Sequence, residues 1–323
     1  MQLVDVLRAR ARITPFVRRT PLVESGWLTD VAHARVSMKL ESLQLSNSFK
    51  SRGAFNALAA LVERDGRSAV ERRGLVTASA GNHGRALAAA AERFRLPLVV
   101  FTPADAPQTK LTAIRRHGAT LRADAHDYDE AERMAKAFAS ERGAAFVSPY
   151  NDREVIAGAG TVALEIIEDA PEVDTLVVPI GGGGLISGVA IVARAIAPSC
   201  RVIGVEVEAS CPFQTSVRAG RLVEIVPGAT LADGLGGNPD PDTITFPFIQ
   251  QLVDEIVLVS EPELAAAVAG LIEHEHLVAE GAGAVGVAAL AAARVDVTER
   301  RVVTILSGSN IDTGRLAGCL TPD

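Results

Sequence analysis

The sequence predicts an α/β protein whose parallel strands are covered by helices on both faces. From about residue 35 onward, short apolar runs alternate with helical patterns almost without a break. Continuous apolar runs are typical of strands that are buried on both faces of a parallel sheet. Hydrophobic residues make up 48% of the 323 residues and aromatic residues only 4%, which suits Ala-rich helices packed closely on Val- and Ile-rich strands.

The elements follow from this alternation in chain order. Strands are predicted at 35–41, 74–79, 98–102, 120–122, 145–148, 175–180, 201–207, 256–260 and 302–306. Helices are predicted at 52–63, 83–94, 110–117, 130–142, 161–168, 187–196, 213–218, 263–273 and 286–294. The stretch 227–248, rich in proline and glycine, is the longest irregular segment, and we interpret it as a surface loop or flap.

Composition and charge exclude several classes of function. The net charge is −7, with acidic and basic residues intermixed and no basic block, so no nucleic-acid partner is expected. No apolar run approaches the ~18 residues of a membrane span. The first 17 residues carry charges every few positions, which is untypical of a signal peptide. The three cysteines are far apart and lack a metal spacing, so we expect reduced thiols in a cytoplasmic protein.

The strongest local motif is the glycine run from Gly181 to Gly184. It follows a predicted buried strand that ends at Ile180 and precedes a helix that begins near Leu185. Consecutive glycines let several backbone N–H groups converge on one anion without interference from a Cβ atom. The run is neither a dinucleotide-binding motif nor a P-loop, so the sequence predicts a cradle for a monophosphate.

Two further polar turns follow predicted strands. Ser79-Ala80-Gly81-Asn82-His83-Gly84 either caps the next helix or, since it has more donors than a helix cap needs, forms a turn that binds a carboxylate. Ser307, in Leu306-Ser307-Gly308-Ser309-Asn310, either contacts a heterocycle nitrogen or caps the next helix. Ligands of parallel sheets bind where strands end and helices begin.

Lys50 lies in Ser46-Asn47-Ser48-Phe49-Lys50-Ser51-Arg52-Gly53-Ala54, at the start of a predicted helix. Considered alone it would be a solvated surface lysine, because lysines are seldom buried. A helix N-terminus, however, disfavours a purely structural cation. The same place suits a lysine that bonds to an anionic cofactor, whose oxygens the backbone N–H groups can hold.

Together these motifs resemble the pyridoxal-phosphate enzymes of the tryptophan-synthase-β fold type (fold type II), and within it the threonine/serine dehydratase and serine racemase family. The resemblance rests on SNSFKSRGA, SAGNHG, GGGGLISG and LSGSN in this order, and extends to RTPL, VIAG, LADG and AEGAGA. It implies two open, twisted, parallel-type sheets with flanking helices. A small substrate-carboxylate domain (74–143) is expected to be inserted in a large domain (1–73 and 144–323) that binds pyridoxal 5′-phosphate.

The resemblance also implies roles for the motif residues. Lys50 is expected to bind the cofactor covalently and then to move the proton at the substrate Cα. The remaining expected cofactor contacts are Phe49 beside the ring, Asn82 at the ring hydroxyl, Gly181, Gly182, Gly183 and Gly184 at the phosphate, and Ser307 at the ring nitrogen. The expected substrate turn comprises Ser79, Ala80, Gly81 and His83. Burial against Phe49 is a candidate cause of a lowered lysine pKa.

Two departures from the family pattern bear on the reaction. Serine racemases carry a second serine where this chain has Ala80, and that serine is their second acid/base. Alanine there favours a dehydratase over a racemase. Relatives that bind a divalent cation have a glutamate at the position of Glu206 and an aspartate six residues later, where this chain has Pro212, so no metal is expected. The motif His274-Glu275-His276 is interpreted as a solvated helix end rather than a metal site.

The predicted function is therefore pyridoxal-phosphate-dependent β-elimination of a β-hydroxy amino acid to a 2-oxo acid and ammonia. L-threonine and L-serine are the leading substrates. Arg153 could select an acidic side chain, which leaves open a dehydratase of 3-hydroxyaspartate or of another specialised β-hydroxy amino acid. Alternatively, Arg153 simply faces solvent. Racemisation and a non-catalytic sensor of a phosphorylated ligand are the competing functions. The resemblance implies a homodimer, and the chain ends too soon after LSGSN for the regulatory domain of biosynthetic relatives.

Overall fold

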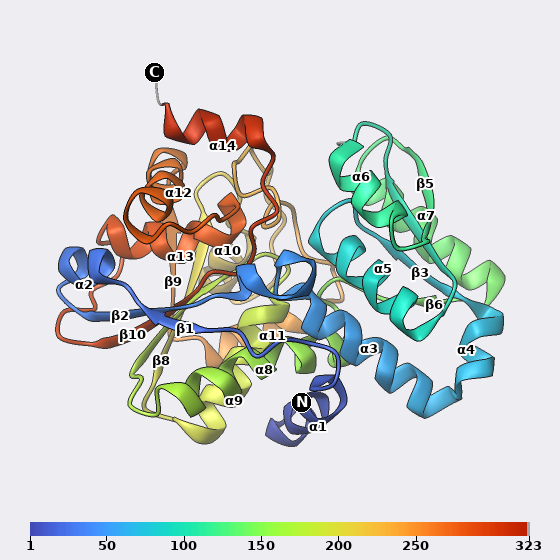
Figure 1. Ribbon diagram of the computed structural model, residues 1–323, viewed down its shortest axis with the longest axis horizontal. Helices are drawn as coiled ribbons and strands as arrows, with labels where there is room; N and C mark the ends of the chain where they lie inside the picture. The colour runs from blue at the N-terminus through green and yellow to red at the C-terminus, as the bar shows by residue number, and fades with distance from the viewer. Residues whose placement is uncertain (107, 322–323) are drawn as a thin grey trace.

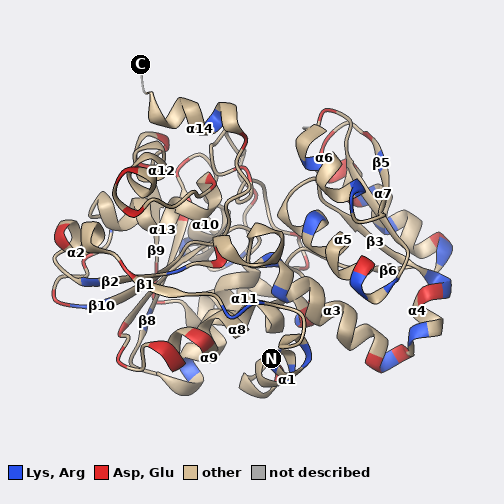
Figure 2. Cartoon of the chain, in the orientation of Figure 1, with Lys and Arg blue, Asp and Glu red and all other residues tan. Residues whose placement is uncertain are grey.

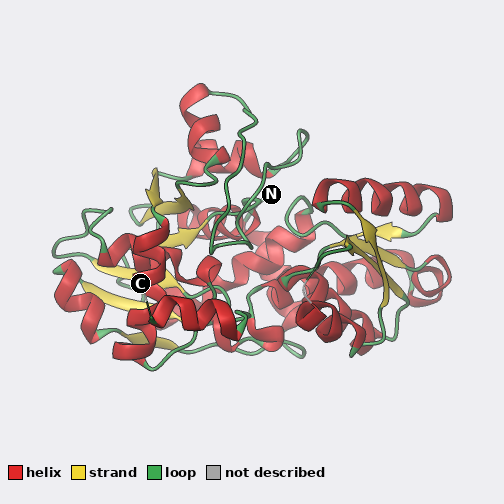
Figure 3. Cartoon of the chain, turned by 90° about the horizontal axis from the view of Figure 1, so that it is seen from above, coloured by secondary structure: helices red, strands yellow, loops and turns green. Residues whose placement is uncertain are grey.

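The computed structural model describes residues 1–106 and 108–321, which form two β-sheets with helices packed on both faces (Figures 1 and 3). The helices are α1 (Leu3–Ile13), α2 (Gly26–Ala32), α3 (Lys50–Asp65), α4 (Arg67–Arg73), α5 (Asn82–Phe94), α6 (Gln108–Arg115), α7 (Tyr128–Arg142), α8 (Arg153–Asp169), α9 (Gly184–Ile196), α10 (Pro212–Ala219), α11 (Thr245–Leu252), α12 (Glu261–Glu275), α13 (Gly281–Ala291) and α14 (Thr313–Leu320), with short 3-10 turns η1 (Glu41–Leu43) and η2 (Leu45–Asn47). The strands are β1 (Leu22–Glu24), β2 (Arg35–Lys39), β3 (Leu75–Ala78), β4 (Leu98–Pro103), β5 (Thr120–Ala125), β6 (Ala145–Phe146), β7 (Thr175–Pro179), β8 (Arg201–Val207), β9 (Glu255–Val259) and β10 (Arg301–Ile305).

The larger sheet has six strands in the order β1-β2-β10-β7-β8-β9. Every neighbouring pair in it is parallel except β1 and β2, which pair antiparallel with Leu22 opposite Lys39. The parallel class predicted from the sequence is confirmed for β2 and the four strands beyond it. The antiparallel edge strand was not predicted, because three residues are too few to show a periodicity.

The smaller sheet has four parallel strands in the order β5-β4-β3-β6. Its strands lie between Leu75 and Phe146, at the right of Figure 1. The predicted inserted domain, 74–143, contains three of these strands, whereas β6 follows its predicted end. The division into two domains at these boundaries stays a prediction.

Alternate residues of the central strands face two different hydrophobic layers. In β7, Leu176 and Val178 pack with buried residues of α8 and α9, and Val177 packs with those of α13. All three side chains are 0% exposed. Each such burial stabilises the fold by about 1.5–3 kcal/mol relative to an exposed side chain, so both faces of this sheet are core.

The carboxyl ends of three neighbouring strands bring the predicted motifs to one edge of the larger sheet. Strand β10 pairs in parallel with β2 on one side and with β7 on the other. Parallel strands end at the same edge, so the segment that leads to Lys50, the turn at Ser307 and the glycine run from Gly181 all leave the sheet together. This edge is where an open α/β sheet binds ligands.

Two glycines set how the helix that carries Lys50 crosses its neighbour. A Cβ atom at Gly158 of α8 would lie 2.4 Å from the Arg52 carbonyl oxygen, and one at Gly53 of α3 would lie 2.9 Å from the Val155 carbonyl oxygen. Only glycine permits such a close backbone approach. Gly158 and Gly160 explain why the prediction placed the start of α8 at 161 rather than at Arg153, since glycine is a poor helix former.

Most other predicted elements agree with the structure within a few residues, and β8 agrees at both ends. Five helices were not predicted: α1, α2, α4, α11 and α14. Basic and acidic residues are interspersed on the same helices, as on α4 (Figure 2). Within the described residues, no helix combines the length and the apolar character needed to cross a membrane.

Candidate active site

Lys50 is the first residue of α3, and the strand ends around it hold its backbone in place. The Phe49 N–H donates to the Ser307 carbonyl at 3.0 Å, and Ser48 forms an antiparallel bridge with Gly308. The Lys50 amine donates to the Pro149 carbonyl at 2.8 Å. Its Nζ atom lies 5.1 Å from the centre of the Phe49 ring.

The environment of Lys50 leaves more of its amine unprotonated at neutral pH than in an ordinary lysine. Desolvation by burial lowers the pKa of the amine to about 8, and the nearby Glu280 carboxylate opposes this shift. At a given neutral pH a larger fraction of the amine is therefore unprotonated than for a solvated lysine of pKa ~10.4. The direction agrees with the prediction that burial activates this residue.

The glycine run lies between β7 and α9 and packs closely against the neighbouring Tyr150 side chain. A Cβ atom on Gly182 would lie 2.2 Å from Cγ of Tyr150, and Gly183 has φ +83°. Side chains are thus excluded here by contact and by backbone conformation. Within the described chain, the N–H groups of Gly181, Gly182 and Gly183 meet no backbone or side-chain acceptor. These donors at a helix N-terminus fit a phosphate group.

The predicted carboxylate turn follows β3 and faces this edge from the smaller sheet. The Gly81 N–H donates to Ser79 Oγ at 3.2 Å. His83 is buried, its Nε2 lies 3.2 Å from the Val147 carbonyl oxygen, and its Nδ1 has no hydrogen-bond partner among the described residues. Burial, followed by the charge of Lys50, lowers the pKa of His83 to about 3, so its ring is neutral near Lys50.

Asn82 has its side chain fixed by two residues from the other end of the chain. Its Nδ2 donates to Glu280 Oε1 at 2.5 Å, and its Oδ1 accepts from Asn310 Nδ2 at 2.7 Å. Arg85 in turn donates to Asn310 Oδ1. Burial raises the pKa of Glu280 to about 7, and the hydrogen bond from Asn82 opposes this shift.

The structure places Ser307 two residues after the end of β10, at the strand end where the sequence predicts it. Its side chain is buried, and its Oγ donates to the Ala282 carbonyl oxygen at 3.3 Å. This neutral hydroxyl, rather than a carboxylate, is the group that the end of β10 contributes.

Three residues at this edge were missed by the sequence analysis. Glu280 and Asn310 lie in motifs that we had identified, AEGAGA and LSGSN, but their contact with Asn82 joins segments 198 and 228 residues apart. Tyr150, against the glycine run, follows the predicted strand 145–148. An aromatic residue after a strand end was the only local signal for it.

Three other residues discussed in the sequence analysis, Glu206, His274 and Arg153, make contacts that stabilise the fold. Glu206 accepts the N–H groups of Phe213 and Gln214 at 3.0 and 2.7 Å and so caps α10. The His274 ring packs on Trp27 with 4.9 Å between centroids. Arg153 has a side chain that is 66% exposed, and it approaches Asp5 at 3.9 Å.

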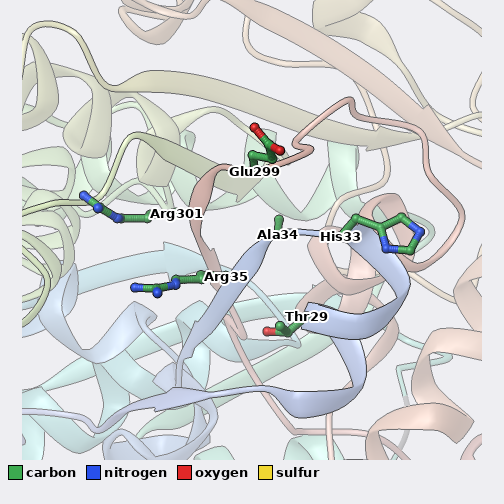
Figure 4. Close-up of a pocket in the computed structure, with 6 residues that line it drawn as sticks. All are labelled: Thr29, His33, Ala34, Arg35, Glu299 and Arg301. Atoms are coloured by element: carbon green, nitrogen blue, oxygen red, sulfur yellow. The ribbon is translucent and has the colours of Figure 1, made fainter.

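A separate surface pocket of about 460 Å³ lies at the opposite edge of the larger sheet (Figure 4). Its lining consists of Thr29, His33, Ala34, Arg35, Glu299 and Arg301. Arg35 and Arg301 are paired in register at the starts of β2 and β10. None of the residues singled out from the sequence lies in this pocket.

Comparisons with known proteins identify the family of this chain. The family model described as pyridoxal-phosphate dependent enzyme matches residues 13–308. An L-threonine ammonia-lyase of Thermotoga maritima is 42% identical over 314 residues, which cover 97% of this chain and 77% of the relative.

Two solved structures of similar proteins share the fold over nearly the whole chain. Maize serine racemase has a TM-score of 0.91 and 33% identity, with 98% of this chain and 95% of that chain covered. The processed form of threonine deaminase isoform 2 from Solanum lycopersicum has a TM-score of 0.89 and 31% identity, with coverages of 98% and 91%. The fold is therefore common to a racemase and to a deaminase and does not separate the two reactions.

Proposed function

Because this chain belongs to the family of pyridoxal-phosphate dependent enzymes, we propose that it is an ammonia-lyase that converts a β-hydroxy amino acid to a 2-oxo acid and ammonia. L-threonine and L-serine are the leading substrates, in line with the likeness to an L-threonine ammonia-lyase and to a threonine deaminase. The observation that carries the proposal is the lysine of lowered pKa at the sheet edge from which the glycine run also leaves.

The residues present fit the cofactor. The N–H groups of Gly181 to Gly184 would hold the phosphate, Asn82 the ring hydroxyl and Ser307 the ring nitrogen, with Phe49 beside the ring. Bound pyridoxal phosphate supplies an aldehyde and an electron-withdrawing ring. The three unpartnered glycine N–H groups support the phosphate assignment.

The side chains of this chain would divide the remaining work among them. Lys50 holds the cofactor and, once released, its amine removes the proton from the substrate Cα. The turn from Ser79 to His83, Ala80 included, binds the substrate carboxylate. His83 stays neutral and does not compete for the proton, because its pKa is far below neutrality.

The partner of the ring nitrogen favours elimination. A serine hydroxyl at Ser307 cannot hold the ring protonated as a carboxylate would, so the ring withdraws electrons less strongly. One proton passes from Cα to the Lys50 amine, and one proton is returned to the β-hydroxyl, which leaves as water. The electron pair left at Cα forms the new Cα=Cβ double bond as the Cβ–O bond breaks, so a long-lived carbanion is not needed. Hydrolysis of the released enamine then yields the 2-oxo acid and ammonia.

Racemisation is the second candidate, because maize serine racemase shares the fold and 33% of the sequence. Ala80 argues against it, since alanine offers no acid or base on the face opposite Lys50. The 3-hydroxyaspartate alternative loses support from Arg153, which is largely exposed and pairs with Asp5.

The proposal also covers the assembly, the compartment and the partners of the protein. We propose a homodimer in the cytoplasm, with a small amino acid as the only partner and neither nucleic acid nor a membrane. Reduced thiols support the compartment, since Cys200, Cys211 and Cys319 are all free. Sedimentation of the purified holoenzyme tests the oligomeric state.

A substrate panel tests the reaction. The holoenzyme is incubated with L-threonine, L-serine, 3-hydroxyaspartate and their D-isomers, and 2-oxo acid, ammonia and inverted amino acid are measured for each. We expect equal amounts of 2-oxo acid and ammonia from L-threonine or L-serine. Inverted amino acid in excess of 2-oxo acid would make the chain a racemase. If no member of the panel gives a product, the non-catalytic sensor of a phosphorylated ligand becomes the favoured function.

The matched variant for this assay is Lys50→Ala. We expect it to lose at least about 10³-fold in kcat/KM, because it removes both the attachment point and the base. Unfolding temperature is measured as a control, since Lys50 makes a single hydrogen bond to Pro149. Activity that survives in a folded Lys50→Ala protein contradicts the assignment.

A further inference from the structure

The loop between α10 and α11 has one aspartate that bonds to three residues in two other parts of the molecule. Asp240 is 8% exposed, and its backbone N–H donates to the hydroxyl oxygen of Tyr150 at 2.9 Å. Its Oδ2 accepts from Asn151 Nδ2 at 3.2 Å, and its Oδ1 accepts from Lys136 Nζ at 3.3 Å. A nearly buried carboxylate is stabilised by such hydrogen-bond and ion-pair partners.

The first of these contacts leads into the candidate active site. The Tyr150 ring lies against the glycine run, where a Cβ atom on Gly182 would be 2.2 Å from its Cγ. The residue before it, Pro149, accepts the hydrogen bond of the Lys50 amine. A shift of Tyr150 therefore moves both a wall of the phosphate cradle and the acceptor beside Lys50.

The same loop is tied to the cradle at a second point. Thr245 Oγ1 donates to the Gly182 carbonyl oxygen at 2.9 Å, and the Ile244 N–H donates to Asn151 Oδ1 at 3.0 Å. The segment 240–245 thus packs along the cradle on one side. Its other side faces α7, which packs on the smaller sheet.

Lys136 of α7 is the connection to the smaller sheet. Its Nζ lies 3.3 Å from Asp240 Oδ1 and 3.3 Å from Glu132 Oε1, one turn back on the same helix. The Lys136 side chain is 47% exposed, whereas that of Asp240 is 9% exposed. Two carboxylates share one ammonium group here, so the position of Asp240 depends on the position of α7.

We propose that Asp240 is a positioning residue that couples α7 of the smaller sheet to Tyr150 on the phosphate cradle. With α7 in the position that it has here, Lys136 lies on Asp240. The loop then holds Tyr150 against Gly182 and keeps the Ser148–Asn151 turn beside Lys50. Closure of the smaller sheet over a bound amino acid and the shape of the cradle are in this way linked through one carboxylate.

A second ion pair between the two parts of the molecule provides the internal control. Lys110 of α6 lies 2.7 Å from Asp233 Oδ2, which Arg315 of α14 also contacts at 3.2 Å. Among the described residues, no hydrogen bond or ion pair joins Asp233 to Tyr150. Loss of Lys110 therefore loosens the smaller sheet without acting on Asp240.

The test follows hydrogen exchange of the holoenzyme in the peptide that covers residues 238–245. In Lys136→Met and in Asp240→Asn we expect the amides of Asp240 and Ile244 to exchange about fivefold faster, as loss of a partly buried ion pair implies. The double variant should exchange no faster than the faster single variant, because both remove the same pair. Lys110→Met should leave this peptide within about twofold of the parent.

Two outcomes overturn the proposal. Unchanged exchange of 238–245 in Lys136→Met shows that α7 does not hold the loop, and equal acceleration in Lys110→Met shows a general loosening. Steady-state kinetics provide a second arm of the test, which rests on the proposed function. Asp240→Asn should raise KM for the amino acid about fivefold and change kcat less than twofold. If the proposed function fails, only this arm is lost, since the exchange measurement needs no turnover.

Discussion

At the scale of single residues, Ala80 is the position that separates two reactions of one family. It lies between Ser79 and Gly81 in the turn that follows β3. Lys50 is then the only group proposed to exchange the Cα proton, and it does so from one face. A hydroxyl at position 80 would offer a second proton donor on the other face.

The substitution Ala80→Ser tests this reasoning. We expect the ratio of racemisation to elimination to rise at least about tenfold, within the range of a positioned acid or base. The ratio is measured from inverted amino acid and 2-oxo acid in one reaction mixture. An unchanged ratio contradicts the role assigned to position 80, and the unfolding temperature of the variant serves as the folding control.

His83 predicts a pH dependence of stability. Its pKa is about 3 in the folded chain and near 6.5 when unfolded. The unfolded chain therefore binds the proton first, so the stabilising contribution is present above pH 6.5 and is lost as the pH falls toward 3. The loss is about 1.4 kcal/mol for each pH unit within that window.

Urea unfolding of the parent and of His83→Gln between pH 7 and pH 5 measures the contribution of His83 to the free energy of unfolding. The free energy of unfolding should fall less steeply with acidification in His83→Gln, by a difference that approaches about 2 kcal/mol over the range. His126→Gln, at an exposed site, should follow the parent. Parallel curves for the parent and His83→Gln would show that this histidine is not buried in neutral form.

At the scale of elements, the glycine run shows how a loop between a strand and a helix becomes a cradle. The substitution Gly182→Ala places a methyl group 2.2 Å from the Tyr150 ring, so the ring or the loop must move. We expect the affinity for pyridoxal phosphate to fall at least about tenfold. Titration of the cofactor-free protein by absorbance measures it.

Gly26→Ala is the matched control, because a Cβ atom at Gly26 in the first turn of α2 meets nothing within 4 Å. Cofactor affinity should not change in this variant. Its stability should rise by about 0.4–1 kcal/mol, since alanine restricts the unfolded chain. If Gly182→Ala and Gly26→Ala bind pyridoxal phosphate with equal affinity, the glycine run does not hold the cofactor.

Element boundaries show what local patterns predict well. The bounds of β8 agree with the prediction because an apolar β-branched run is a strong local signal. The start of α8 was misplaced because Gly158 and Gly160 weaken the helical pattern. Those glycines are present for close contact with α3 and α9, a tertiary reason that outweighs helix propensity.

At the scale of the whole molecule, a buried ionic cluster joins segments from all over the larger part of the fold. Arg52 is 1% exposed and bonds to Glu41 and Glu165, while Lys39 lies 2.8 Å from Glu165. Two positive and two negative charges thus balance in the interior. The cluster fixes the start of α3, two residues after Lys50.

Arg52→Met should destabilise the protein by about 3–5 kcal/mol, because it leaves Glu41 without its cationic partner in the interior. Arg10→Met is the surface counterpart: Arg10 and Glu168 are 42% and 44% exposed, and its loss should cost less than about 1 kcal/mol. Chemical denaturation of both variants measures the difference. Similar losses in the two would mean that the Arg52 cluster is solvated.

The sequence by itself determined the alternation of strands and helices, the lysine at a helix start, and the glycine run after a buried strand. These features depend on neighbouring residues, and local patterns report them. Only the tertiary structure decided which side chains hold Asn82 and what Asp240 connects. Those contacts join residues about 90 to 230 positions apart, and their geometry follows from strand order and helix packing, which no local pattern encodes.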